Sequence, residues 1–131
     1  IDFQLDLSIE GEDEQLAFSC CGIVLPSRLA GRQPPVDGVT VEIDDAERLR
    51  ADTLRGKRMG FGAKLCIHPK QVAPVNACFS PSVEEVAWAH RIVDAAAAAG
   101  NAAVAIDGKM VDRPVIVKAE RVLSEAGEGG A

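Results

Sequence analysis

The chain has 131 residues, of which 47% are hydrophobic and 26% charged, values that are typical of a folded globular domain. Its net charge of −6 argues against a nucleic-acid-binding surface, because phosphate groups are bound by basic stripes and the sequence shows none. No apolar run is long enough to span a membrane, and the acidic start of the chain does not resemble a signal peptide.

The four cysteines do not form a recognisable disulfide or zinc framework. Cys20 and Cys21 are adjacent, and the spacing of Cys66 and His68 is wrong for a usual metal-binding pair. We therefore expect Cys20, Cys21, Cys66 and Cys78 to be reduced thiols in a cytoplasmic protein. The chain also starts without Met, inside a segment that we interpret as a strand, which suggests a fragment or a processed chain.

The first part of the chain alternates strand-forming and helix-forming segments. They are a strand end at 1–5, a helix at 14–29, a strand at 36–43, a helix at 45–60 and a buried strand at 63–67. Asp13 is a candidate N-cap of the first helix, and Asp44 or Asp45 of the second. Gly60 marks the end of the second helix, whose last turns carry basic residues.

The second part is predicted to consist of helices and one hairpin. Pro69 favours a helical turn over 69–79, and Ser82 with Glu85 forms a capping box for an alanine-rich helix that ends near residue 99. Strands at 102–106 and 109–111 can pair across the favoured turn Asp107-Gly108. A last helix is expected at 113–126, with Pro114 in its first turn.

The alternation of strands and helices predicts an α/β fold with a parallel sheet. No glycine-rich turn follows a strand, so the pattern does not indicate a dinucleotide-binding fold. A (β/α)8 barrel takes about 250 residues, and this chain holds three strand–helix units at most.

Two motifs carry a resemblance to a known family: GFGAKLCIHPKQ, residues 60–71, and DGKMVDRP, residues 107–114. Together with the weaker IDFQLDLSIEG and VDGVTVEIDD, they resemble the C-terminal half of citrate lyase β-subunit-like CoA-ester lyases, of the HpcH/HpaI aldolase superfamily. The resemblance implies the C-terminal half of a TIM (β/α)8 barrel, residues 1–99. A hairpin-helix extension, residues 100–131, would pack on a neighbouring subunit. Ser8 departs from the family, which usually has Gly at this position.

The resemblance also implies roles for five residues. Asp2 matches a Mg²⁺ ligand, and Ile1, Asp2, Ile67 and His68 match positions that bind the substrate or CoA, the last two largely through backbone groups. Asp112 matches a catalytic acid delivered in trans, which implies a homo-oligomer with a trimer as the expected assembly. The family's second metal carboxylate and its substrate-binding arginine have no counterpart in the sequence.

The implied reaction cleaves or forms a C–C bond in a β-hydroxyacyl-CoA such as citryl-CoA or malyl-CoA. Cleavage leaves an acetyl-CoA enolate, which Mg²⁺ would stabilise and the carboxyl group of Asp112 would protonate. Burial of Asp112 beneath a neighbouring subunit would raise its pKa for this task. In the reverse reaction, the carboxylate of Asp112 would take a proton from the methyl group of acetyl-CoA.

Other interpretations stay open at this point. The chain alone could be an inactive fragment that binds CoA or a partner subunit, and we expect the isolated chain to lack activity. A related Mg²⁺ aldolase acting on pyruvate is a further alternative. The segment DGKMVDRP argues against it, because it resembles the C-terminal extension of the CoA-ester lyases. Asp112 could also cap a helix. Asp37 could hydrogen-bond near the substrate, but a turn role is expected, and Trp88 is expected in the core or between packed helices.

Overall fold

The structure is a computed structural model that describes residues 2–11, 14–100, 104–106 and 108–127. The chain divides into two compact units, Ile1–Phe79 and Ser80–Ala131, called here the N-terminal and the C-terminal unit. The predicted boundary between barrel and extension, after residue 99, lies inside the second unit. The assignment of 1–99 to a partial barrel stays a prediction.

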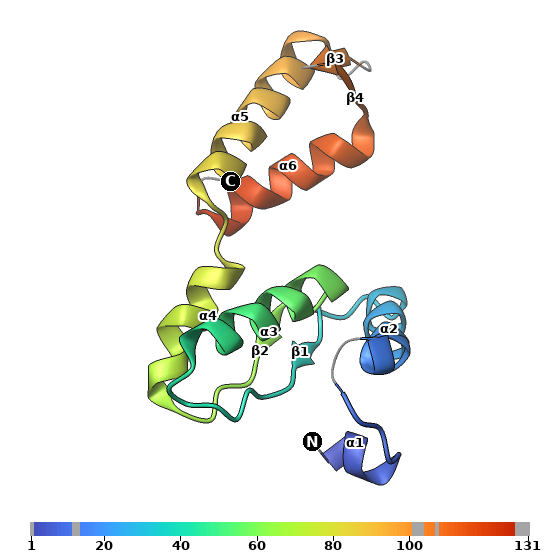
Figure 1. Cartoon of the computed structure of the whole chain (residues 1–131). Helices are drawn as coiled ribbons and strands as arrows, with labels where there is room; N and C mark the ends of the chain where they lie inside the picture. Colours follow the sequence, from blue (N-terminus) through green and yellow to red (C-terminus); the bar gives the residue numbers. More distant parts are fainter. Residues whose placement is uncertain (1, 12–13, 101–103, 107, 128–131) are drawn as a thin grey trace. The chain divides into compact units, whose positions relative to one another are not determined.

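The N-terminal unit combines helices with two short parallel strands (Figure 1). Its elements are α1 Asp2–Asp6, α2 Glu14–Leu29, β1 Val36–Asp37, α3 Ala46–Met59, β2 Ala63–Lys64, the 3-10 helix η1 Pro69–Gln71 and α4 Val72–Phe79. Val36 pairs with Ala63 and Asp37 with Lys64, so α3 connects two parallel strands. This βαβ arrangement confirms the predicted mixed α/β character and the parallel pairing.

The strand end predicted at residues 1–5 is wrong for the described part of that segment, because Asp2–Asp6 forms the helix α1. Its backbone groups bond locally, with Leu7 N–H donating to Phe3 O at 3.1 Å and Ile9 N–H to Gln4 O at 2.8 Å. The alternation of apolar and polar residues is too short to specify a strand when no neighbouring strand pairs with the segment. Ser8 follows with φ 54°, the left-handed region that favours glycine.

Both predicted central strands are shorter than expected. The segment 36–43 contributes only Val36–Asp37 and the segment 63–67 only Ala63–Lys64. The last backbone bond between the two segments runs from Leu65 N–H to Asp37 O at 3.0 Å. Beyond that point, side-chain contacts connect the two segments, as described below.

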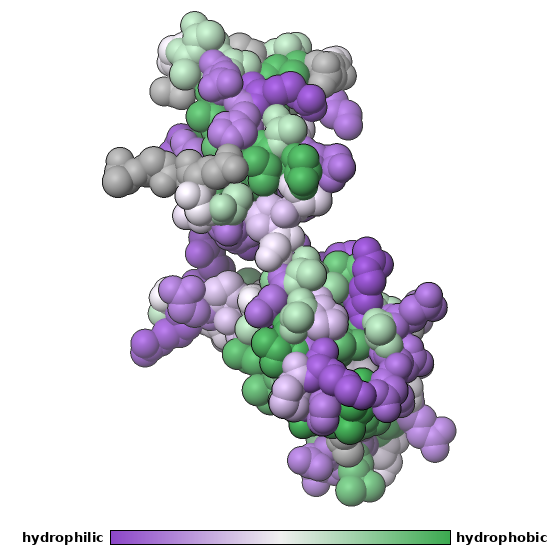
Figure 2. Space-filling model, turned by 90° about the vertical axis from the view of Figure 1, so that its left-hand side faces the viewer, coloured by the Kyte–Doolittle hydropathy of each residue, from purple (hydrophilic) through white to green (hydrophobic). Residues whose placement is uncertain are grey.

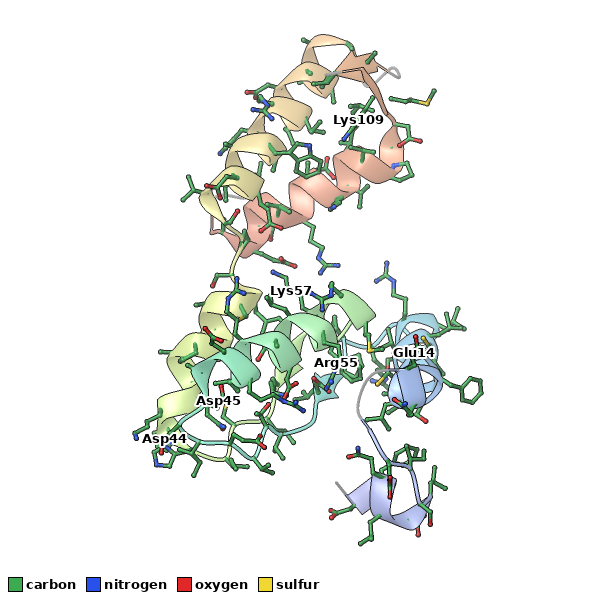
Figure 3. All side chains as sticks on the ribbon, in the orientation of Figure 1. Glu14, Asp44, Asp45, Arg55, Lys57 and Lys109 are labelled. Atoms are coloured by element: carbon green, nitrogen blue, oxygen red, sulfur yellow. The ribbon has the colours of Figure 1, made fainter. Side chains whose placement is uncertain are left out.

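The caps of α3 agree with the sequence. The side chain of Asp45 accepts a hydrogen bond from Arg48 N at 2.8 Å, so Asp45 rather than Asp44 is the N-cap (Figure 3). Gly60 ends the helix with φ 99°, a conformation that side chains other than that of glycine rarely allow. The predicted cap Asp13 of α2 lies outside the described residues.

The C-terminal unit is a helix pair joined by a hairpin (Figure 1). Its elements are α5 Val83–Ala98, β3 Val104–Ile106, β4 Lys109–Val111 and α6 Arg113–Glu125. The strands are antiparallel, and Ile106 pairs with Lys109 across the predicted turn, of which Gly108 has φ 73° and Asp107 lies outside the described residues. Both bonds of the predicted capping box between Ser82 and Glu85 are present.

Apolar packing between α5 and α6 forms the core of the C-terminal unit. Its buried members are Ala89, Ile92, Ala96, Val111, Ile116, Ala119 and Leu123. Trp88 packs against this cluster, and the ammonium group of Lys118 lies 5.4 Å from the centre of its ring. The predicted packing role of Trp88 is confirmed.

The N-terminal unit has a different interior and surface. Its buried apolar residues are Leu49, Phe61 and Val75, whereas Thr40, Asp52, Thr53, Lys64 and Gln71 are buried polar or charged residues. Large apolar side chains on its surface include Phe18, Leu25, Leu29 and Val41, and hydrophobic and hydrophilic areas alternate over the face in Figure 2. None of the helices in the described part of the chain is long and apolar enough to cross a membrane.

Candidate functional site

The predicted CoA-contacting residues, Ile67 and His68, lie just beyond the end of β2. The side-chain amide of Gln71 holds this segment: its Oε1 accepts a hydrogen bond from Ile67 N at 3.0 Å. Its Nε2 donates to Thr40 O at 2.9 Å, in the segment that follows β1. We call Thr40, Ile67, His68 and Gln71 the strand-end cluster.

His68 has the extended backbone that the following proline predicts, with φ −143° and ψ 142°. Its Nδ1 accepts a hydrogen bond from Lys70 N at 3.2 Å, so the imidazole caps η1. An acceptor role for Nδ1 requires the neutral tautomer with the proton on Nε2. Nε2 is then a hydrogen-bond donor at the end of the strand segment.

A surface ion pair lies beside the strand-end cluster. Lys70 Nζ donates to Asp44 Oδ1 at 2.7 Å, and both side chains are exposed. The hydrogen bond from Lys70, and then its positive charge, lowers the pKa of Asp44 below its ordinary value of 3.8. The pair ties the turn before α3, labelled at Asp44 in Figure 3, to the helical turn after β2.

The cluster is anchored to α3 through a buried carboxylate. Thr40 Oγ1 donates to Asp52 Oδ2 at 2.9 Å, and Arg48 Nε donates to the same oxygen at 3.2 Å. Arg55 lies 3.7 Å from the other carboxylate oxygen. Two guanidinium groups thus compensate the cost of burying the Asp52 charge.

A second buried ion pair lies between β1 and β2. The side chain of Lys64 is only 2% exposed; its Nζ donates to Gly38 O at 2.9 Å and lies 3.6 Å from Asp37 Oδ2. The other oxygen of Asp37 accepts from Gly38 N at 2.8 Å. Asp37 lies in the strand β1 and pairs with Lys64, so the turn predicted at this residue is wrong. The contacts of Asp37 with Lys64 and Gly38 therefore stabilise the pairing of β1 with β2.

The cysteines are free thiols, as expected from their spacing. Burial, and then the negative charge of Asp37, raises the pKa of the Cys20 thiol. A protonated thiol is a poor nucleophile and metal ligand, which supports the packing role predicted for Cys20.

The structure places the predicted metal ligand, Asp2, at the exposed start of α1 instead of at the end of a strand. Ile1 lies outside the described residues. Among the residues that the structure describes, no three His, Cys, Asp or Glu side chains lie close enough together to hold a metal ion. The described residues therefore do not by themselves fit a Mg²⁺ site.

Asp112 occupies the N-cap position of α6, and its carbonyl accepts the first helical bond from Ile116 N at 3.1 Å. Its side chain makes no capping hydrogen bond and is exposed. The cap position predicted from Arg113-Pro114 is confirmed, whereas the carboxylate is not used for capping. Asp112 and Asp2 belong to different units.

Sequence reasoning missed the residues that hold the strand-end cluster, namely Thr40, Asp52, Lys64 and Gln71. Their contacts join segments up to 31 residues apart, which no local pattern reveals. One usable signal was present: Gln71 stands in the helical turn that His68-Pro69 begins, next to the predicted site.

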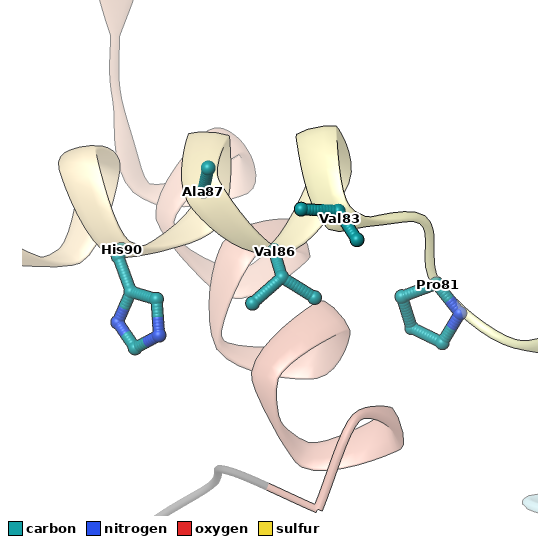
Figure 4. Close-up of a pocket in the computed structure, with 5 residues that line it drawn as sticks. All are labelled: Pro81, Val83, Val86, Ala87 and His90. Atoms are coloured by element: carbon teal, nitrogen blue, oxygen red, sulfur yellow. The ribbon is translucent and has the colours of Figure 1, made fainter.

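A shallow pocket of about 400 Å³ lies on α5 in the C-terminal unit. Val86 and His90 project from the same side of the helix (Figure 4). Pro81, Val83 and Ala87 complete the lining, so no predicted site residue contributes to this pocket.

Known proteins resemble the chain over most of its length. A citrate lyase subunit β-like protein from Deinococcus radiodurans is 41% identical over 84% of the chain. The citrate lyase subunit β of Escherichia coli is 36% identical over 88%, and a (3S)-malyl-CoA thioesterase from Cereibacter sphaeroides is 36% identical over 95%. The matches cover 39%, 39% and 45% of these relatives, so the chain spans less than half of their length. No protein-family model matches the chain.

Solved structures agree with this. The crystal structure of CitE from Mycobacterium tuberculosis, in complex with magnesium, acetoacetate and coenzyme A, matches 83% of the chain with a TM-score of 0.73 and 37% identity. The match covers 40% of the CitE chain. A citrate lyase from Burkholderia xenovorans matches 87% of the chain and 36% of its own, with a TM-score of 0.75; at 24% identity it supports the fold alone. On these similarities, the chain belongs to the citrate lyase β-subunit-like family.

Proposed function

We propose that the protein is a Mg²⁺-dependent CoA-ester lyase, which cleaves or forms a C–C bond in a β-hydroxyacyl-CoA of the citryl-CoA or malyl-CoA type. One observation carries the proposal: the chain is 37% identical to CitE, whose structure contains magnesium, acetoacetate and coenzyme A. Relatives named citrate lyase subunit β and (3S)-malyl-CoA thioesterase support the class of CoA ester.

The strand-end cluster is the proposed CoA-contacting part of the site. Ile67 is 51% exposed, so an incoming ligand can reach it. His68 offers its Nε2–H as a donor, because Nδ1 already accepts from Lys70 N. These features support binding through hydrogen bonds and apolar contact and do not require His68 to act as a base.

Asp112 is the proposed acid, acting on a neighbouring subunit of a homo-oligomer, with a trimer as the proposed assembly. In cleavage, the hydroxyl group of the substrate becomes a carbonyl group as its proton passes to solvent, and the breaking C–C bond leaves its electron pair on the acetyl-CoA enolate. The carboxyl group of Asp112 then gives its proton to the enolate carbon and completes the methyl group. The exposure of this side chain and its freedom from capping support the assignment.

Ile1 and Asp2 are proposed as substrate-binding residues, with Asp2 as a single Mg²⁺ ligand. Carboxylate oxygens are the ligands that Mg²⁺ prefers. Among the described residues, Asp2 is not part of a group of three His, Cys, Asp or Glu side chains that could hold a metal ion. The acid–base role of Asp112 is therefore proposed independently of the ion.

Because the isolated chain is expected to lack activity, the test uses a full-length version of the protein, incubated with Mg²⁺ and citryl-CoA or malyl-CoA, and separates the CoA products by chromatography. Formation of acetyl-CoA supports C–C cleavage, whereas release of free CoA with the intact acid indicates thioester hydrolysis. Asp112→Ala is expected to lower the turnover number about 100-fold or more and to leave CoA affinity unchanged. Undiminished turnover in Asp112→Ala would disprove the catalytic role.

Ser82→Ala is the matched control for this variant, because Ser82 is also an N-cap. Ser82 makes its capping bonds, so its loss should lower the free energy of unfolding by about 1 kcal/mol. Asp112 makes no such bond, and Asp112→Ala should leave the free energy of unfolding nearly unchanged. A loss of turnover in Asp112→Ala alone then reports chemistry instead of stability.

A CoA-binding or subunit-interaction module is the second candidate. The observation that favours it is the strand-end cluster, which offers CoA an exposed apolar side chain at Ile67 and a hydrogen-bond donor at His68 Nε2. Binding of CoA without turnover of any tested ester would support this candidate over the lyase.

A further inference from the structure

We propose that Gln71 is a positioning residue that holds the Ile67–His68 segment in the geometry that receives CoA. The proposal rests on the CoA-binding function proposed above. It assigns to Gln71 a role in ligand affinity that neither its residue type nor its position in a helical turn reveals. The argument begins with the way β1 and β2 end.

The register of the strand pair continues beyond the last backbone bond. Asp37 pairs with Lys64, so counting three residues further along both parallel segments brings Thr40 opposite Ile67. At this position the side chain of Gln71 connects the two segments, since it accepts from Ile67 N at 3.0 Å and donates to Thr40 O at 2.9 Å. The amide thus replaces the backbone bonds that the segments no longer make directly.

Only a primary amide suits this position. Asn and Gln side chains present a carbonyl acceptor and an N–H donor together, as a peptide group does. Leucine offers neither, and ionised glutamate would place an acceptor against the carbonyl of Thr40. Gln71 is 1% exposed, so water cannot replace a lost bond without entering the interior.

Gln71 also fixes His68 through its own backbone. Its N–H donates to His68 O at 3.0 Å and closes the turn of η1. One residue therefore binds the N–H group of Ile67 and the carbonyl group of His68, the two residues proposed to contact CoA. Because both groups are bound to Gln71, the Ile67–His68 segment is ordered before any ligand arrives, which lowers the cost of ordering it on binding.

The other end of the bridge is rigid. Thr40, which accepts from Gln71, is itself held by the bond from its hydroxyl group to Asp52 on α3. Movement of the strand-end cluster would therefore break buried bonds to the helix. This rigidity supports a positioning role for Gln71.

The experiment compares Gln71→Leu and Gln71→Glu with the unchanged chain. CoA affinity is measured by calorimetry, and exchange of the Ile67 amide proton by NMR. We expect Gln71→Leu to weaken CoA binding about tenfold and to accelerate Ile67 exchange by a similar factor, because both side-chain bonds are lost. Gln71→Glu keeps an acceptor for Ile67 N but sets a second acceptor against Thr40 O, so it should also weaken CoA binding and accelerate Ile67 exchange. It gives a second readout if Gln71→Leu folds poorly.

Thr53→Val is the matched control. Thr53 is equally buried, and its hydroxyl group donates to Leu49 O at 2.6 Å, a bond within α3. Its substitution should lower stability while leaving CoA affinity and Ile67 exchange unchanged. If Thr53→Val weakens CoA binding as much as Gln71→Leu does, the effect comes from stability and the positioning role is wrong.

The remaining outcomes separate the inference from the proposed function. If the unchanged chain binds CoA and Gln71→Leu binds it equally well, the positioning role is wrong and the CoA-binding function stands. If the unchanged chain does not bind CoA, the proposed function is wrong and the inference falls with it. If Ile67 exchange is the same in all variants, the bridge does not hold the segment and the inference is overturned.

Discussion

Each of the two units is stabilised internally by a different kind of contact. The C-terminal unit buries apolar side chains between α5 and α6. In the N-terminal unit, buried polar and charged side chains connect β1, β2 and α3, and the buried apolar residues are few among those described. The comparison separates stability from geometry: apolar packing has little directionality, whereas a hydrogen bond specifies which two atoms meet.

This difference has a consequence for substitution. Removing a buried apolar side chain leaves a cavity, which costs more than a typical hydrogen bond contributes. Removing one polar partner in the N-terminal unit leaves a buried group unsatisfied and releases a segment from its position. We therefore expect the largest losses of stability in the C-terminal unit and the most local changes of geometry in the N-terminal unit.

The largest effect is expected for Ile116→Ala. Ile116 is buried on the face of α6 that packs against α5. Deleting three methyl or methylene groups should lower the free energy of unfolding by about 2–5 kcal/mol. Urea unfolding followed by circular dichroism measures the loss, and amide exchange shows whether it is concentrated in α5 and α6.

Val117→Ala is the control, because this neighbour on α6 is exposed. Its substitution should change stability by less than about 0.5 kcal/mol. Equal effects at the two positions would contradict the apolar core as the source of stability in this unit.

A smaller loss of stability is expected for Gly56→Ala on α3, although a glycine-to-alanine change in a helix usually raises stability. Alanine normally stabilises a helix relative to glycine by about 1 kcal/mol. A Cβ atom at Gly56, however, would overlap Asp37 Oδ2, the oxygen that faces Lys64 in the buried ion pair. Gly56→Ala should therefore lower the free energy of unfolding, by about 1–3 kcal/mol.

Gly22→Ala on α2 is the matched substitution, since no atom lies within 4 Å of the added Cβ. It should raise the free energy of unfolding by about 0.5–1 kcal/mol, as helix propensity predicts. Chemical unfolding of both variants gives the comparison. A stabilised Gly56→Ala protein would show that α3 does not pack closely on Asp37.

The same contrast explains how much of the fold was predictable from sequence. The helices α3, α5 and α6 follow from capping residues and apolar spacing, and the hairpin follows from Asp107-Gly108, because these signals are local. The segment at 1–5 was predicted wrongly and the strands at 36–43 and 63–67 were predicted too long. Strand formation depends on pairing partners, which a local pattern does not contain.

The candidate site also has some features that local sequence predicts and others that only the three-dimensional structure reveals. The extended His68 and the cap position of Asp112 follow from the prolines at 69 and 114, which restrict their neighbours. The roles of Gln71 and Asp52 depend on the register of β1 and β2 and on the packing of α3, so they emerge only in three dimensions. Composition gives no indication that these two polar residues are buried.

The smallest effect is expected at the surface pair of Asp44 and Lys70, which sharpens the comparison because it is polar but exposed. The hydrogen bond and charge of Lys70 lower the pKa of Asp44 in the folded state. The stabilisation from the pair is therefore fully present above pH 3.8, the ordinary value, and is lost as the pH falls through the lowered pKa. Lys70→Met should return the Asp44 pKa toward its ordinary value, as measured by NMR titration of the carboxyl carbon.

Glu84 supplies an internal control in the same titration. Its pKa is also lowered, first by its own backbone N–H and then by the Ser82 side chain, and Lys70 is not among the causes. Lys70→Met should therefore leave the titration of Glu84 unchanged while that of Asp44 moves. Salt should weaken the Asp44 shift in the unchanged chain, because exposed charges are screened. An Asp44 titration that is insensitive to Lys70→Met would show that the pair does not form in solution, and the turn before α3 would then be held by the Asp45 cap and the buried bonds of Thr40 and Asp52.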